Sequence, residues 1–180
     1  MKRTKVKLGV LVLAVLAVCL GFSTSQAQDM DALWRGKWFR ATVTYSGKYT
    51  NGSGVLLAYR EKEVDYLKIL SVDEGNKVVN LLNYIYEDGQ WQEESVDWYY
   101  TGGNSLDFLC YYFVCEGEDH RYCFGFTGRV QGKMKGGIVT SATIKSLGGL
   151  EWNDYDNEAA GVTFSAKSIS ESKLPLGIPK

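Results

Sequence analysis

The residues with the clearest potential for chemistry lie between Leu106 and Val130. Structural zinc prefers thiolate and imidazole ligands, and this stretch offers a set of four. They are Cys110, Cys115, His120 and Cys123, in the spacing C-x4-C-x4-H-x2-C. The spacing lacks a close C-x2-C pair, and Cys110 and Cys115 would point to opposite faces of one strand. We therefore expect no metal and no cofactor here. A disulfide between Cys115 and Cys123, with Cys110 as a buried apolar residue, explains the pattern better.

The same stretch predicts a β-hairpin. Leu106–Cys115 and Tyr122–Val130 are apolar, aromatic runs on either side of a polar turn, and their side chains should alternate between two faces. With the turn centred on Asp119, Cys115 faces Cys123. One face is then almost wholly apolar and is predicted to face the core. It consists of Phe108, Cys110, Tyr112, Val114, Phe124, Phe126, Gly128 and Val130.

The amino-terminal segment has the features of a secretory signal peptide. A basic leader precedes the apolar run Leu8–Leu20, and Ser25-Gln26-Ala27 is a small-x-small cleavage site. We expect residues 1–27 to be removed and the mature chain to be secreted or periplasmic. Cys19 offers a lipoprotein alternative, which the bulky Val18 before it disfavours.

Removal of the leader changes the charge balance. It takes away four of the 20 basic residues and none of the 21 acidic ones, so the mature chain is acidic. An acidic chain is a poor partner for nucleic acid, which needs a basic face. No further apolar run is long enough to span a membrane as a helix. The composition leaves the oligomeric state open.

The mature chain is predicted to be all-β. Short alternating runs are punctuated by glycines and polar clusters, and both prolines lie in the last six residues. Serial hairpin connections favour a single antiparallel up-and-down β-barrel of about 8–10 strands over residues 28–168. We expect residues 169–180 to form a loosely held tail. Asp88-Gly89 is the best hairpin signal.

Two polar segments are predicted to divide strands. The charged link Arg60–Glu63 separates Val55–Tyr59 from Val64–Val72. Ser146–Gly149 similarly precedes a short strand at Leu150–Trp152.

Large aromatic residues occupy many of the positions predicted to point inward. Buried tyrosines need partners for their hydroxyls, so their excess suggests a pocket lining, although aromatic packing of a barrel wall would also explain it. The expected pocket would bind a small ligand without catalysing a reaction. The candidate ligand-binding residues are Tyr45, Tyr59, Tyr66, Tyr84, Trp98, Phe108, Tyr112, Phe124 and Phe126.

Gly36-Lys37-Trp38 opens the first predicted strand after a short helical turn. In this motif, size, export signal and serial hairpins, the chain resembles lipocalin-like (calycin-type) secreted β-barrels. The resemblance implies that Trp38 closes the barrel floor and that the interior binds a small apolar or amphipathic molecule. Trp38 differs in parity from Phe39 and Ala41, so pointing it inward requires a bulge.

Other functions have weaker signals. A carbohydrate- or surface-contacting β-sandwich could use Trp91, Tyr99 and Trp152. An enzyme on a barrel scaffold would need a carboxylate buried beside a tyrosine. Glu93 and Asp97 share a strand face and could act as an acid–base pair, but an outer polar face explains them.

An acidic loop adds a candidate calcium site. It contains Glu151, Asp154, Asp156 and Glu158. It lacks the glycine and distal glutamate of an EF-hand loop, so we expect a solvated loop.

Overall fold

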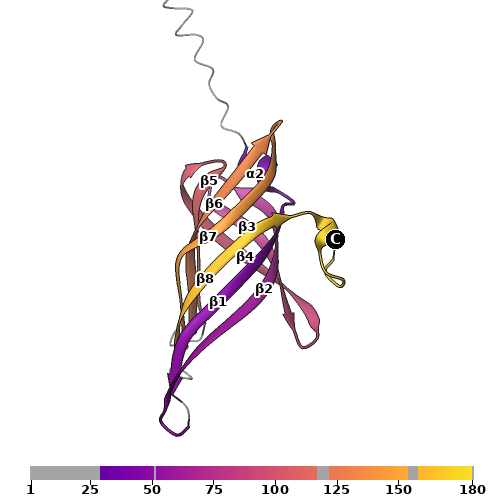
Figure 1. Ribbon diagram of the computed structural model, residues 1–180. Helices are drawn as coiled ribbons and strands as arrows, with labels where there is room; N and C mark the ends of the chain where they lie inside the picture. The colour runs from indigo at the N-terminus through magenta and orange to yellow at the C-terminus, as the bar shows by residue number, and fades with distance from the viewer. Residues whose placement is uncertain (1–28, 51, 117–121, 154–157, 180) are drawn as a thin grey trace, which may run out of the picture.

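The computed structural model describes residues 29–50, 52–116, 122–153 and 158–179. Eight antiparallel strands form a closed barrel in which each strand pairs with its neighbours in sequence and β1 pairs with β8 (Figure 1). The strands are β1 (Trp38–Thr50), β2 (Leu56–Asp73), β3 (Val78–Glu87), β4 (Gln90–Asn104), β5 (Asp107–Glu116), β6 (Tyr122–Lys135), β7 (Ile138–Asn153) and β8 (Glu158–Ile169). A short helix, α2 (Met30–Trp34), precedes them, and a 3-10 turn, η1 (Glu171–Lys173), follows. The predicted up-and-down barrel is confirmed.

None of the helices in these ranges is long and apolar enough to cross a membrane.

Two of the predicted strand breaks are wrong. β2 continues through Arg60–Glu63, and β7 continues through Ser146–Gly149 with an irregularity in its pairing to β8. The charged side chains of residues 60–63 alternate between the two faces of one strand, so they are compatible with a strand that runs without a break through this segment.

Primed-turn geometry joins β3 to β4. Asp88 and Gly89 both have positive φ, at 50° and 83°, as a type I′ turn requires. The strongest hairpin signal in the sequence therefore marks a real hairpin.

The β5–β6 hairpin has the predicted register. Cys115 pairs with Cys123, Tyr112 with Phe126 and Phe108 with Val130. The two cysteines form a disulfide with Cα atoms 4.1 Å apart. This bond engages two of the four ligands that the zinc alternative requires, and it fits an oxidising compartment.

Loss of this disulfide should lower stability measurably. The bond closes a loop with a sequence separation of 8, and the chain-entropy model gives about 2.5 kcal/mol for a loop of that size. We expect the double variant Cys115→Ser/Cys123→Ser to lose this amount in urea unfolding. Dithiothreitol should lower the wild-type protein to the same value and leave the variant unchanged. A wild-type protein insensitive to the reductant would contradict the prediction.

Helix α2 closes one end of the barrel (Figure 1). The carboxylate of Asp31 accepts a hydrogen bond from the Val72 amide at 2.7 Å. That amide lies beside the register shift between Ile69 and Ser71 in β2, so the helix satisfies a backbone donor next to this irregularity.

Trp34 forms the floor of the barrel. It is fully buried, its Nε1 donates to the Ser105 carbonyl at 2.7 Å, and its ring meets Phe108 edge-on at 5.7 Å. A Cβ on Gly132 would come within 3.1 Å of this ring, so the wall opposite has little room for a side chain. The tryptophan at the floor is therefore the one from α2 and not Trp38.

Trp38 instead lies in a second cluster on the outer surface of the barrel. It packs with Tyr66, Tyr84 and Ile178, and Lys68 lies over its ring at 5.0 Å. β1 has no bulge at this point, so parity turns Trp38 outward while Phe39 and Ala41 face the core.

The carboxy-terminal tail covers this outer cluster. Ile178 is only 5% exposed, and a Cβ on Gly177 would meet the Trp91 ring at 3.2 Å. The expectation of a loosely held tail overlooked Leu174 and Ile178, whose apolar side chains dock on Trp38 and its neighbours. The docked tail keeps this aromatic surface out of water.

Candidate functional site

A cavity of about 700 Å³ lies inside the barrel. Its inner end is formed by Leu67, Trp98, Phe126 and Phe164, and Tyr49 and Tyr59 line it farther from α2. Along β2, Glu61 is exposed whereas Asp65 and Leu67 are buried, so the cavity is open at the end opposite α2. One end is therefore apolar and enclosed, and the other is polar and accessible.

The enclosed end is an aromatic cluster. Trp98 of β4 meets Phe126 of β6 at 5.2 Å and Phe164 of β8 at 5.4 Å, both edge-on. Phe126 and Phe164 are stacked at 4.7 Å. These residues occupy inward positions of their strands, and their rings interlock to form a rigid apolar surface.

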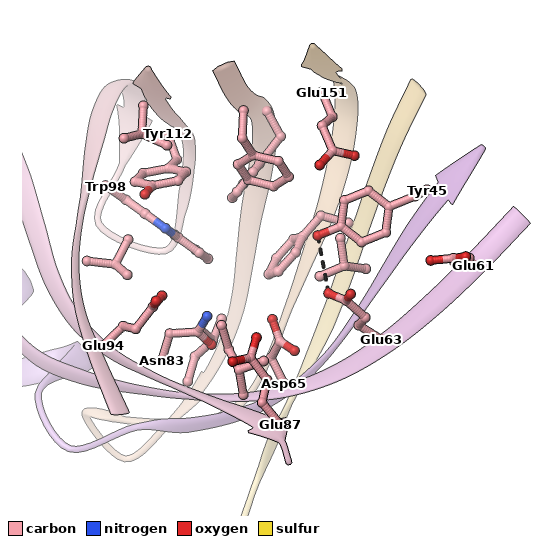
Figure 2. A pocket seen from close by; sticks show the side chains of 18 of the residues that line it. Tyr45, Glu61, Glu63, Asp65, Asn83, Glu87, Glu94, Trp98, Tyr112 and Glu151 are labelled. Atoms are coloured by element: carbon pink, nitrogen blue, oxygen red, sulfur yellow. Dashed lines mark hydrogen bonds between the residues drawn. The ribbon is translucent and has the colours of Figure 1, made fainter. Parts of the chain in front are cut away.

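Carboxylates dominate the polar part of the wall (Figure 2). They are Glu61, Glu63, Asp65, Glu87, Glu94 and Glu151. No lysine, arginine or histidine occurs among the described residues that line the cavity. Glu61, Glu63 and Asp65 are spaced by two along β2, which places all three on its inner face. The cavity is therefore strongly acidic.

Asp65 is the most deeply placed of these acids. It is 6% exposed, and its Oδ1 has no hydrogen-bond partner. Burial raises the pKa of this carboxyl to about 7, and repulsion from the charges of Glu63 and Glu94 adds to the rise. A hydrogen bond with the side chain of Asn83 acts in the opposite direction and lowers the pKa. Asp65 therefore exchanges its proton near neutral pH.

Tyr45 links the aromatic and acidic parts of the wall. Its hydroxyl donates to Glu63 Oε2 at 3.2 Å, and its ring lies 6.3 Å from that of Phe124. Burial, together with the charge of Glu63, raises the pKa of this hydroxyl well above its ordinary range. Tyr45 is thus a neutral hydrogen-bond donor.

Most of the aromatic residues predicted to bind ligand do line the cavity. These are Tyr45, Tyr59, Trp98, Tyr112, Phe124 and Phe126. Tyr66 and Tyr84 lie in the outer cluster with Trp38, since they have the opposite parity to Asp65 and Asn83. Phe108 is buried beside Trp34, below the cavity.

Sequence reasoning missed the acidic half of the site. The alternation of Glu61, Glu63 and Asp65 is the available signal, but the basic residues Arg60 and Lys62 beside them make the segment resemble a solvated link. The cavity acid on β4 is Glu94, whereas the predicted pair Glu93 and Asp97 lies exposed on the outer face of this strand.

The remaining chemical candidates do not form a site in the described part of the chain. No three histidine, cysteine, aspartate or glutamate side chains there are placed to hold a metal ion. Cys110 is a buried free cysteine, and burial raises its thiol pKa to about 12. His120, which belongs to the zinc alternative, lies outside the described residues, and so do Asp154 and Asp156 of the predicted acidic loop.

No protein-family model, curated protein or solved structure gave a significant match to the chain.

Proposed function

We propose that this protein is an exported, lipocalin-like binding protein of the calycin type, which holds a small amphipathic molecule inside its barrel without chemically changing it. The observation that carries the proposal is the cavity of about 700 Å³, with an aromatic enclosed end and a polar open end. Small-molecule sites have volumes of about 300–1,000 Å³ and combine apolar walls with a few polar groups. The apolar part of a ligand would enter first and lie against Trp98.

Two features typical of exported proteins support this function. The amino-terminal segment has the basic, apolar and small-x-small regions of a signal peptide. The Cys115–Cys123 disulfide is of the kind that persists outside the reducing cytoplasm.

The test is binding of a neutral apolar dye, N-phenyl-1-naphthylamine. We expect its fluorescence to rise on binding, and Val96→Trp, which places an indole ring in the cavity, to weaken binding about tenfold or more. Ser95→Trp is the matched control because Ser95 is exposed and its neighbour Val96 lines the cavity. Val114→Trp and Phe113→Trp form a second such pair on β5, since Val114 lines the cavity and Phe113 is 67% exposed.

Circular dichroism and thermal unfolding establish that each variant is folded before binding is compared. Equal binding by the inward and outward variants of both pairs would overturn the proposal.

One observation favours an enzyme as the second candidate. Asp65 is a carboxyl with a pKa of about 7, in the same cavity as the half-buried Tyr45, and a general acid–base works best when its pKa is near the working pH. Mass spectrometry of a bound ligand after long incubation separates the two functions. Recovery of the ligand unchanged supports binding, whereas a new product that disappears with Asp65→Asn supports catalysis.

A further inference from the structure

We propose that the cavity selects organic cations, namely molecules with an apolar body and a protonated amine, and that the ammonium group binds at Asp65. This inference rests on the proposed binding function and specifies the chemistry of its ligand. It is carried by three observations: the charge of the wall, an unpaired buried oxygen, and the position of that oxygen at the border between acidic and aromatic surfaces.

The charge of the wall is the first observation. Carboxylates project into the cavity from β2, β3, β4 and β7, without a basic side chain among the described lining residues. A concave site lined by one sign of charge concentrates the field and raises the local concentration of the opposite ion. An anionic ligand such as a fatty acid would be repelled by the same wall.

The second observation is the Asp65 carboxylate itself. The Asp65 side chain lines the cavity and is only 6% exposed. The side chain of Asn83 hydrogen-bonds to its carboxyl group, but the Asp65 Oδ1 has no hydrogen-bond partner, and neither has the Oδ1 of Asn83. A buried acceptor without a partner carries an unrecovered desolvation cost, and a charged donor recovers most in such a place. An ammonium group supplies both the donor and the compensating charge.

The third observation is where Asp65 lies. On the inner face of β2 it has Glu63 on the open side and Leu67 on the enclosed side. An ammonium at Asp65 therefore leaves the rest of the ligand against Leu67, Trp98 and the other rings at the enclosed end. Tyr45 and Trp98 face the same space (Figure 2), and aromatic faces also attract cations.

The spread of the acids favours an organic cation over a metal ion. They are distributed around the wall on four strands, and no three such groups in the described ranges converge on one point. A metal ion needs several oxygens at about 2.0–2.6 Å, whereas an extended cation contacts a wide wall.

Isothermal titration calorimetry with matched probes tests this inference. Decylammonium, 1-decanol and decanoate share an alkyl chain and carry a positive, zero and negative charge. At pH 8 we expect decylammonium to bind about ten- to a hundredfold more tightly than 1-decanol, as hydrogen bonds to charged groups allow, and decanoate to bind most weakly. Asp65→Asn should weaken decylammonium binding by a similar factor and leave 1-decanol binding unchanged.

The control variant is Asp97→Asn. It removes the same charge from the exposed outer face of β4, so it should alter the affinity of neither probe by more than about twofold, because exposed charges are screened by salt. Titration at pH 7 in buffers of different ionisation enthalpy adds a second readout. Decylammonium should release a proton from Asp65, whose surroundings include Glu63, Glu94, Glu87 and Asn83, and Asp65→Asn should abolish this release.

The outcomes separate the two proposals. Equal affinities for decylammonium and 1-decanol would overturn cation selection and leave the binding function standing. Equal losses of decylammonium affinity in Asp65→Asn and Asp97→Asn would overturn the role of Asp65. Failure of every probe, the neutral dye included, would overturn the binding function itself.

Discussion

Replacing Trp34 with alanine should lower the free energy of unfolding by about 3–5 kcal/mol, the usual cost of truncating a large buried aromatic residue. Trp34, the last residue of α2, has no exposed surface, and its ring fills the end of the barrel against Phe108 and Gly132. The substitution also leaves the Ser105 carbonyl without the donor that it now has at 2.7 Å. The surrounding strands are joined in a closed ring and cannot collapse far into the space, so most of the cavity cost remains.

Urea unfolding followed by circular dichroism measures this loss. Phe113→Ala is the control, since its ring is 67% exposed on the outer face and its removal should cost under about 1 kcal/mol. Similar losses in the two variants would show that α2 does not close the barrel as described.

Asp65→Asn should become more stable than the wild-type protein as the pH rises. Because the folded pKa of about 7 lies above the ordinary value of 3.8, the folded protein binds this proton more tightly than the unfolded chain. The free energy of unfolding of the wild-type protein therefore falls as the pH rises from 3.8 to about 7. Above pH 7 the whole destabilisation caused by the buried Asp65 charge is present. One pKa unit corresponds to about 1.4 kcal/mol, so this cost is on the order of 4 kcal/mol. Asparagine has no charge to desolvate, so the Asp65→Asn variant lacks this destabilisation.

The measurable quantity is the stability difference between variant and wild type at pH 4 and pH 8, from urea unfolding. We expect it to change by a few kcal/mol in favour of Asp65→Asn, and Asp97→Asn to show no such change because its carboxylate is exposed. A difference that stays constant with pH would mean that Asp65 is well solvated or paired. The predicted instability also has a functional reading, since binding sites often retain groups that are unfavourable until the ligand arrives.

The sequence was most informative where hydrophobic alternation and turn chemistry agree. The β5–β6 hairpin, its register and the Cys115–Cys123 disulfide all follow from one apolar face that a shift of one residue would destroy. The Asp88-Gly89 turn follows from the need for positive φ at both positions. Local rules therefore suffice for those elements.

The acidic cavity could not be found by the same rules. Alternation assigns Glu61 and Glu63 to the same face of β2. Because this face is charged, its polarity predicts that it is the outer one, yet in the closed barrel it lines the interior. Trp38 shows the converse, because an apolar residue of outward parity is covered by the tail residue Ile178, far away in sequence. In both cases burial is decided by tertiary partners that a local pattern does not contain.

The seam between β1 and β8 governs the order in which the molecule can assemble. Phe39, near the beginning of the barrel, pairs with Ser168 near its end. Until the last strand has been delivered, β1 and β7 each present an open row of backbone donors and acceptors that can pair with another chain. Pairing between residues so far apart in sequence is slow to form, because the entropy cost of bringing the two ends together precedes any stabilising contact. During synthesis from the amino-terminal end, the chain thus remains prone to aggregation until residue 169 is available to complete β8. A chain truncated within β8 should keep these open edges and therefore stay prone to aggregation.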